Sequence, residues 1–268
     1  MHIPTERWHQ ALKVRKSRRQ FNSQAIPLEI IAKLEELCLE LNSKFTGVRT
    51  ALVNHNPDRV FKGAIGSYGK IKGAPAYVAF IGDLKAPEVQ VKLGYMGEAF
   101  ILEATALGLG TCWVGGFFKP DVVAEDIKLS VEEKVLSVTP IGYAGETFNR
   151  EERLMVNLAS SHKRKDLAKL CSGLPEKEWS DWVHSALEAA RIAPSAVNRQ
   201  PWRFHVERDS ITIAVDSQLN LTHISKRLDC GIAMLHLEIG ALAKGVTGTW
   251  TYLDSPQVAV FRPTKIDS

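Results

Sequence analysis

Hydrophobic positions recur at helical spacing in the first half of the chain. Apolar residues between Ile30 and Leu41 follow this spacing after Pro27, a residue suited to the first turn of a helix, and predict a helix there. Leu93–Leu107 is apolar on nearly all faces and is followed by Gly108. Because a helix of that character is buried, we expect it to be central to the fold.

Shorter apolar runs predict strands around these helices. Ala76–Ile81 is a continuous apolar run of strand length and is expected to be buried. Val135–Tyr143 is expected to contain another strand, with a break at Thr139-Pro140. Just before it, Ser130 and Glu133 have the spacing of a capping box, so a further helix is expected to open there.

The same kinds of element follow in the second half. An apolar stripe from Trp179 to Ala190 predicts a helix, which stops before Pro194 because proline disfavours helical geometry in the preceding residue. The charged stretch 163–177 is the expected junction between the halves. A hairpin and a last strand are predicted over Trp202–Val206, Ile211–Val215 and Val258–Phe261.

An internal repeat relates the two halves. Leu93–Trp113 aligns with Cys230–Trp250 without a gap, and identical residues fall at a constant separation of 137 positions, for example 231 − 94. The glycines and tryptophans at and beyond the helix ends favour a duplication over a chance likeness of two apolar helices. The identical pairs are Gly94 and Gly231, Ala104 and Ala241, Gly108 and Gly245, and Trp113 and Trp250.

The composition is that of a globular protein with enough apolar material for a large core. Of 268 residues, 45% are hydrophobic and 24% are charged. The formal charge of +4 comes from scattered basic residues, apart from short clusters at Arg15–Arg19 and Lys163–Lys165. A nucleic-acid-binding protein would show a broader basic face, so no nucleic-acid partner is expected. Two compact clusters fit a small anionic ligand better.

The cysteines and the apolar stretches indicate a compartment. Four cysteines (Cys38, Cys112, Cys171 and Cys230) lie far apart, without metal-ligand spacing, so free, buried thiols and no metal are expected. The chain begins without the apolar core of a signal peptide, and no stretch approaches the roughly 18 apolar residues that span a bilayer. We therefore expect a soluble, cytoplasmic protein with no membrane partner.

The basic segment Arg15-Lys16-Ser17-Arg18-Arg19 is the first candidate site. In an extended chain the side chains of Arg15, Ser17 and Arg19 point the same way. Two guanidinium groups and a hydroxyl on one side would hold a phosphate dianion through charge-assisted hydrogen bonds. A solvated basic segment without a ligand is the alternative interpretation.

The stretch Ala193–Phe204 is the second candidate and the more specific one. Pro194 and Pro201 prevent regular structure, so the polar residues between them are expected on a stiff loop between a helix and a strand. Such a loop presents polar groups with little entropy to lose, as recognition of a planar heterocycle requires. A rigid connector beside the core residue Trp202 is the alternative.

The glycine-rich stretch Gly108–Phe117 is the third candidate. Its glycine pairs would let backbone amides approach a ligand closely. It lacks the GxGxxG pattern and no strand leads directly into it, which argues against a dinucleotide-binding Rossmann unit. A helix cap at Gly108 followed by a tight turn is the alternative.

Together these segments resemble the nitroreductase family of flavoproteins. Arg15–Arg19 matches the family's Arg-x-Ser-x-Arg phosphate motif, and Pro194–Trp202 matches its proline-serine loop ending in Asn-x-Gln-Pro-Trp. Gly108–Gly116 is similar to the family's Gly-Leu-Gly segment and its turn against the flavin. Arg164-Lys165-Asp166 resembles a late pair that returns to the phosphate.

The order of the motifs departs from the family. In ordinary members the loop follows the phosphate motif by a few tens of residues, but here Leu41–Thr46 holds that place. The second half contains the loop, lacks the phosphate motif, and has Thr251-Tyr252-Leu253 in place of Val114-Gly115-Gly116. The flavin of the family lies at a dimer interface, between the phosphate motif of one subunit and the loop of the other. This complementary loss therefore indicates that both halves of the dimer are fused into one chain.

The resemblance implies an α+β fold of two related halves, residues 1–165 and 174–268, each a mostly antiparallel sheet with helices. The central helices Leu93–Leu107 and Gly231–Lys244 are expected at the pseudo-dimer interface. One FMN is implied per chain, with NAD(P)H as co-substrate and a nitroaromatic, quinone or similar small molecule as electron acceptor. FMN fits better than FAD because no adenine-binding Rossmann unit is visible. The chain is expected to be a monomer that acts as a pseudo-dimer.

The cofactor carries the hydride step in this family, so no catalytic side chain and no metal ligand is expected. Gly115 and Gly116 would lie near the reactive edge of the flavin, and Pro194, Ser195 and Asn198 near the ring. An FMN-binding protein with little turnover, serving in storage or sensing, is the alternative function. The implied cofactor-binding residues are Arg15, Lys16, Ser17, Arg19, Gly115, Gly116, Arg164, Lys165, Pro194, Ser195, Ala196 and Asn198.

Overall fold

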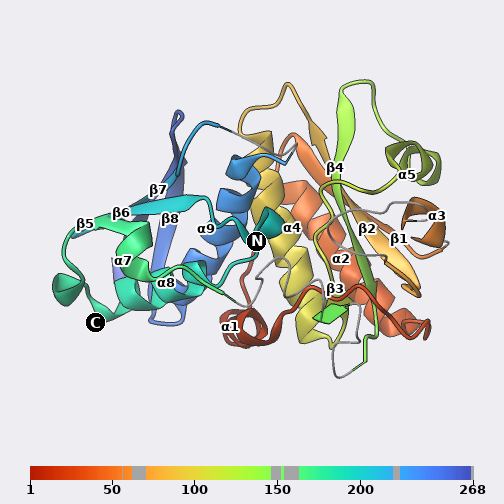
Figure 1. The fold of residues 1–268 in the computed structure, drawn as a ribbon, viewed down its shortest axis with the longest axis horizontal. Coiled ribbons are helices and arrows are strands. Elements are labelled where there is room, and N and C mark those ends of the chain that lie inside the picture. The colour runs from red at the N-terminus through yellow and green to blue at the C-terminus, as the bar shows by residue number, and fades with distance from the viewer. Residues whose placement is uncertain (56, 62–70, 146–151, 154–162, 220–223, 267–268) are drawn as a thin grey trace. The chain divides into compact units, whose positions relative to one another are not determined.

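The computed structural model describes residues 1–55, 57–61, 71–145, 152–153, 163–219 and 224–266, and the chain divides into two compact units (Figure 1). Unit 1 contains Met1 and residues 14–89 and 99–162, and unit 2 contains residues 2–13, 90–98 and 163–268. Helix α4 (Val89–Ala106) therefore contributes its first turns to unit 2 and its later turns to unit 1.

Unit 1 contains a four-stranded antiparallel sheet in the order β1-β2-β4-β3. Its helix α2 and strand β2 confirm the first helix and the buried strand that the hydrophobic pattern predicts. Besides the later turns of α4, its elements are α2 (Leu28–Lys44), β1 (Val48–Val53), α3 (Pro57–Phe61), β2 (Ala76–Asp83), β3 (Gly110–Thr111), α5 (Pro120–Asp126) and β4 (Glu133–Gly142).

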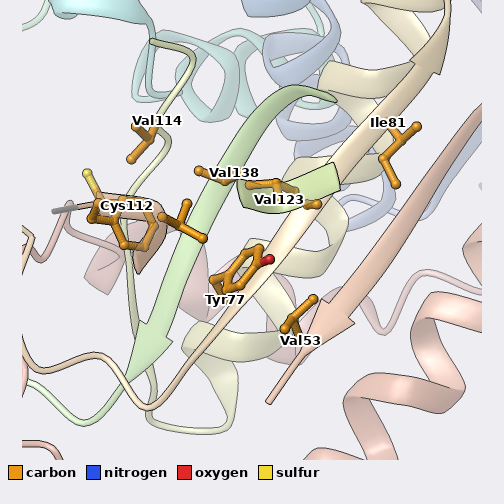
Figure 2. Packing of buried hydrophobic residues seen from close by; sticks show 10 residues of the cluster. Val53, Tyr77, Ile81, Cys112, Val114, Val123 and Val138 are labelled. Atoms are coloured by element: carbon orange, nitrogen blue, oxygen red, sulfur yellow. The ribbon is translucent and has the colours of Figure 1, made fainter. Parts of the chain in front are cut away.

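Strand β2 is buried on both of its faces. On one face, Tyr77 and Ile81 belong to a hydrophobic cluster with residues of α3 and α5, among them Val123 (Figure 2). On the other face, the ring of Phe80 packs edge-on against Phe100 of α4, with 6.4 Å between the ring centroids. Because both faces are covered, the strand has a continuous apolar sequence instead of an alternating one.

Unit 2 contains a five-stranded sheet in the order β5-β6-β7-β9-β8, in which only β5 and β6 pair in parallel. The antiparallel pair β6 and β7 confirms the predicted hairpin, and α8 and β9 confirm the predicted helix and last strand. The elements are α1 (Thr5–Val14), α7 (Leu167–Leu170), β5 (Cys171–Gly173), α8 (Asp181–Arg191), β6 (Trp202–Glu207), β7 (Ser210–Val215), α9 (Lys226–Leu242), β8 (Val246–Tyr252) and β9 (Gln257–Ile266).

The two sheets share one topology. Apart from the short helices α3 and α5, the order α2-β1-β2-α4-β3-β4 in one half corresponds to α8-β6-β7-α9-β8-β9 in the other. The corresponding strands also have the same spatial order, β1-β2-β4-β3 and β6-β7-β9-β8. Both long helices are followed by a left-handed glycine, Gly108 with φ of 82° and Gly245 with φ of 73°. The prediction of two related, mostly antiparallel halves with helices is confirmed.

Helices α4 and α9 cross at a pair of glycines that the repeat aligns. A Cβ atom at Gly94 would collide with the carbonyl group of Leu228, and a Cβ atom at Gly231 would collide with the carbonyl group of Val91. Leu228 and Val91 are themselves 137 positions apart (228 − 91), so the two helices make the same contact in both directions. Such a reciprocal contact is the signature of a two-fold interface between equivalent elements. The crossing supports the predicted duplication.

The predicted helix at Ser130 is wrong, because the chain enters strand β4 there. The Ser130 N–H does donate to the Glu133 carboxylate at 2.9 Å, as in a capping box. The backbone then makes a turn, in which the Glu133 N–H donates to the Ser130 carbonyl oxygen at 3.1 Å. Glu133 also pairs with Arg49 of β1 at 2.6 Å, and the residues that follow pair with β2. Pairing with the sheet overrides the local helix signal.

The predicted break at Thr139-Pro140 is also absent, since β4 runs through Pro140 opposite Tyr77 of β2. On the other side of β4, regular pairing is interrupted between the Thr111–Ile141 pair and the isolated Val114–Val138 bridge. The Cys112 N–H donates to the Thr139 hydroxyl oxygen at 3.2 Å instead of to a backbone carbonyl. A proline, which has no N–H to donate, is tolerated at this interruption.

The expected junction, residues 163–177, contains regular structure. Helix α7 lies within it, and β5 pairs with residues 204–206 of β6. Residues 163 onward belong to unit 2. The charged sequence of this stretch has no pattern that predicts a strand, yet β5 forms the edge of the second sheet.

Candidate functional site

The basic segment 15–19 is extended, as its predicted role requires. Ser17 forms a parallel bridge with Thr111, and the Arg18 N–H donates to the Thr111 carbonyl oxygen at 2.7 Å. On the other side, Gln20 forms a parallel bridge with Lys72. The segment therefore runs alongside the end of β3, where consecutive side chains alternate in direction.

Arg18 has a structural partner in Glu152. The Nε and Nη2 atoms of Arg18 each donate to the Glu152 carboxylate at 3.2 Å, and Nη1 donates to the Gly145 carbonyl oxygen at 2.5 Å. The same carboxylate accepts the backbone N–H of Arg19 at 2.8 Å. Burial alone would raise the pKa of Glu152, but these hydrogen bonds outweigh it and hold the pKa below its usual value. Glu152 thus fixes the backbone of the segment.

The Arg19 side chain differs from that of Arg18. Arg19 is only 8% exposed, and its Nε atom is buried with no hydrogen-bond partner. Among the described residues, no carboxylate or carbonyl oxygen accepts a hydrogen bond from its guanidinium group. A buried charge without a counter-charge is costly, so this position is suited to an anionic ligand. Of the other predicted residues here, Arg15 and Ser17 are half-buried and Lys16 is exposed.

The turn Gly115–Phe117 follows the Val114–Val138 bridge in unit 1. A Cβ atom at Gly116 would have no described atom within 4 Å, so packing within the protein does not require glycine there. Phe117 beside it has a left-handed backbone, with φ of 61°, and remains 50% exposed. The space at Gly116 is open to a ligand that approaches the backbone closely.

The loop between α8 and β6 has an unusual backbone. Val197, Asn198 and Gln200 have φ values of 47°, 56° and 48°, in the left-handed region that non-glycine residues rarely occupy. Each such residue costs on the order of 1–3 kcal/mol, and it persists only where surrounding contacts fix it. The loop lies between a helix and a strand, as predicted, and its one 3-10 turn, Ala196–Asn198, is distorted at Val197.

Arg164 and Lys165 lie against this loop. Arg164 Nη1 donates to the Asn198 side-chain oxygen at 2.9 Å, and Asn198 Nδ2 donates to the Lys163 carbonyl oxygen at 3.0 Å. The Lys165 N–H donates to the side-chain oxygen of the buried residue Gln200 at 2.8 Å, and its ammonium donates to the Gln200 carbonyl oxygen at 3.1 Å. The two segments therefore form one hydrogen-bonded group.

A buried ion pair ties the loop to α9. Asp229, in the first turn of that helix and 1% exposed, accepts the Arg199 Nε–H at 2.6 Å and the Ala196 N–H at 3.1 Å. Burial raises the pKa of the Asp229 carboxyl to about 6, although Arg199 and the Ala196 N–H favour its ionised form. Within the loop, the Ser195 hydroxyl oxygen accepts the Gln200 N–H at 2.9 Å.

The structure brings the predicted residues together within each unit. In unit 1 the basic segment lies beside β3, and Gly115 and Gly116 follow that strand four and five residues after Thr111. In unit 2 Arg164, Lys165, Ser195 and Asn198 share one hydrogen-bond network, to which Ala196 is joined through Asp229, and Pro194 is half-buried beside them.

Sequence reasoning missed Glu152, Arg199 and Asp229 as parts of these sites. Asp229 had a signal: it is a lone acidic residue at the start of an apolar helix, and the repeat aligns it with Lys92 (229 − 92 = 137). Glu152 had no comparable signal, because its partner Arg18 is 134 positions away. Gln200 lies in the loop motif but is not among the residues that the sequence predicts for the site.

The fold is that of a nitroreductase. A crystal structure of a protein from Thermotoga maritima MSB8, described as a "putative nitroreductase", matches over 99% of this chain and 97% of its own, with a TM-score of 0.66 and 19% identity. The sequence gives the family: the model described as "Putative TM nitroreductase" matches residues 8–241. The chain belongs to this family.

Ordinary nitroreductase structures match a smaller part of the chain. A nitroreductase family protein from Clostridium difficile 630 matches 64% of this chain and 98% of its own, with 20% identity and a TM-score of 0.45. A nitroreductase with bound FMN from Bacteroides fragilis NCTC 9343 matches 53% and 90%, with 17% identity and a TM-score of 0.43. No curated protein sequence matches the chain.

Two further features concern the described residues only. None of their helices combines the length and the apolar character that crossing a bilayer requires. The four cysteines are free thiols, with Cys38, Cys112 and Cys230 buried and Cys171 partly exposed.

Proposed function

We propose that this protein is an FMN-dependent oxidoreductase that passes electrons from NAD(P)H to an electron-poor small molecule such as a nitroaromatic or a quinone. The observation that carries the proposal is Arg19, a residue that is only 8% exposed, with a buried Nε atom and no acidic partner among the described residues, in a chain of the nitroreductase family. A phosphate group would supply the missing counter-charge.

The chemistry of the donor set fits FMN. Arg15, Lys16, Ser17 and Arg19 offer cationic and hydroxyl donors on one extended segment, which suits a phosphate. The open space at Gly116, which follows Gly115, suits the edge of a flat ring. Pro194, Ser195, Ala196 and Asn198, together with Arg164 and Lys165, are the further residues that we propose for the flavin.

The protein residues bind and orient in this proposal, while the flavin, when bound, supplies the hydride chemistry. The strained loop 195–200 would hold its donors and acceptors at fixed positions against the ring, so little entropy would be lost on binding. The Asn198 side chain is already engaged by Arg164 and Lys163, so we assign it to positioning of the loop as much as to direct contact. No side chain is assigned as a general acid or base.

We also propose that the chain works in the cytoplasm as a monomer, with both halves of the family's dimer in one polypeptide and one flavin per chain. The free cysteines support a reducing compartment. The shared topology of the two sheets supports the pseudo-dimer. Only one Arg-x-Ser-x-Arg motif and one proline-serine loop are present in the sequence, which supports a single site.

The test is the flavin content and turnover of the purified chain. We expect a yellow protein that releases one FMN per polypeptide and oxidises NADH or NADPH when menadione or a nitroaromatic is supplied. Two flavins per chain, or none after reconstitution with FMN, would contradict the proposed site. Stoichiometric FMN without turnover of any acceptor would instead favour an FMN-binding protein for storage or sensing.

A further inference from the structure

We propose that Asp229 and Arg199 are positioning residues for the flavin, because their ion pair holds loop 195–200 in the conformation that receives the ring. Neither residue is among the proposed cofactor contacts. The inference rests on the proposed function for the identity of the ligand, but its structural part concerns the loop alone.

The carboxylate of Asp229 accepts hydrogen bonds from two residues of the loop. Asp229 Oδ1 accepts the Ala196 N–H at 3.1 Å, and Oδ2 accepts the Arg199 Nε–H at 2.6 Å. Arg199 Nη2 also donates to the Ile224 carbonyl oxygen at 2.9 Å, just before α9. Ala196 and Arg199 enclose the two residues Val197 and Asn198, so the carboxylate fixes both ends of that segment.

The enclosed residues need this restraint. Val197 and Asn198 are consecutive and both left-handed, and Val197 is β-branched, which makes its conformation the less favourable of the two. Val197 is 42% exposed, so packing against its side chain is a weak restraint. Strained backbone persists where contacts on both sides over-determine it, and Asp229 supplies such contacts.

A purely structural explanation would not favour a carboxylate here. Asp229 is 1% exposed on a helix whose other buried residues are apolar apart from His236, and a neutral side chain at its position would avoid the cost of burying a charge. Arg199 is the charged group that faces the carboxylate from the loop. On α9, Arg227 and Cys230 are its neighbours, and Asp216 after β7 pairs with Lys226. The carboxylate stands at a position from which its two oxygens reach the loop.

The experiment compares the full chain with Asp229→Asn, which keeps the shape of the side chain and removes its charge. Glu133→Gln is the matched control, because Glu133 also pairs with an arginine, Arg49, but lies on β4 in unit 1. Amide hydrogen exchange of residues 196–200 is measured in the flavin-free protein. The rate of FMN dissociation is measured by the recovery of flavin fluorescence after dilution.

We expect Asp229→Asn to accelerate exchange of the Ala196 and Asn198 amides by about tenfold or more, the size expected when a charged hydrogen bond is lost. FMN dissociation should accelerate by a similar factor, and Glu133→Gln should change neither rate. Arg199→Lys, which keeps the charge but not the planar group, should fall between wild type and Asp229→Asn. Unchanged exchange in Asp229→Asn would overturn the inference, as would loosened exchange with unchanged FMN dissociation.

Acidity provides a second measurement. Protonation of Asp229 weakens its hold on Arg199, so FMN should leave the wild-type protein faster as the pH falls from 7 to 5. Asp229→Asn keeps every other titrating group, including the flavin phosphate, and should show a smaller change over this range. Equal pH dependence in the two proteins would overturn the inference. If the wild type binds no FMN, the proposed function fails, and exchange of the loop amides still decides whether the ion pair positions the loop.

Discussion

The basic segment 15–19 and the loop 193–202 are both polar and both predicted to bind the flavin, yet they are built in opposite ways. In the basic segment, Arg18 is bound to Glu152 while the buried guanidinium of Arg19 has no acidic partner in the described chain. In the loop, the side chains of Ser195, Asn198 and Gln200 are already engaged with one another or with residues 163–165.

This difference in partners suggests that the basic segment binds the ligand and that the loop positions it. A charge that the protein leaves uncompensated gains most from a ligand of opposite charge, so Arg19 should control affinity. Side chains that satisfy each other gain little from a ligand individually, but they fix a surface against which a flat ring can lie. The two segments should therefore respond differently to substitution.

The largest effect on stability should come from substitution of Arg18, because Arg18 binds Glu152 within the protein. Arg18→Met leaves the Glu152 carboxylate buried without its partner, and we expect a loss of about 3–5 kcal/mol in the free energy of unfolding. Chemical denaturation measures it. Arg49→Met, which breaks a more exposed pair, should cost about 0–1 kcal/mol. If both variants lost the same small amount, Arg18 would have no special structural role.

Arg19 should show the reverse pattern. Arg19→Met removes a buried charge that has no partner, so the free energy of unfolding without flavin should stay the same or rise. FMN binding should weaken by about 1.5–3 kcal/mol, the loss of a charged hydrogen bond at the phosphate. Riboflavin, which has no phosphate, should bind the variant and the wild type equally by fluorescence titration. Equal weakening for both flavins would show that Arg19 acts through the fold.

Acid should expose the structural pair in a second way. The pKa of Glu152 is lower in the folded chain than in the unfolded one, so its stabilising contribution is complete above the unfolded value and is lost as the pH falls through the folded one. Glu152→Gln should therefore be least stable relative to wild type near neutral pH. The difference in free energy of unfolding between the two proteins should become smaller in acid. A stability difference that is constant from pH 7 to pH 3 would show that the charge of Glu152 does not contribute to stability.

The smallest effect should come from strain in the loop. Val197→Gly places glycine at a left-handed position and should stabilise the protein by about 0.5–1 kcal/mol, after the extra entropy of glycine in the unfolded chain is subtracted. Val197→Ala, which keeps a Cβ atom, is the control and should give no such gain. Thermal unfolding of the two variants measures the difference. A destabilising glycine would mean that the valine side chain packs more than its 42% exposure indicates.

Much of the fold could be predicted from the sequence, because its strongest signals are long-range patterns of apolar residues. Helices α2, α4 and α8 and strands β2, β6 and β7 follow from periodicity, and the duplication follows from the constant separation of paired glycines. Ser130 shows the limit, since half of a capping box forms there and the chain still enters β4. A local motif has no information on the neighbouring strand that competes for the backbone.

The candidate site was predictable as residue types but not as contacts. Alternation along an extended chain already separates Arg19 from Arg18. The sequence does not show that the distant Glu152 binds Arg18 and that Arg19 has no acidic partner in the described chain. The hold of Asp229 on the loop joins residues 30 or more positions apart that share no motif. Pairings of this kind depend on tertiary structure and leave no pattern along the chain.

The reciprocal crossing of α4 and α9 has a consequence for how the protein can evolve. In a homodimer every substitution occurs in both subunits, so neither copy of a site can be lost alone. Dilution also favours dissociation of the two subunits. Here the equivalent helices belong to one polypeptide, and their association is governed by the effective concentration that the connecting chain imposes. Gly94 and Gly231 remain alike because each still packs against the other helix. A substitution outside that crossing changes one half alone, so the single site that we propose requires each half to keep only its own part.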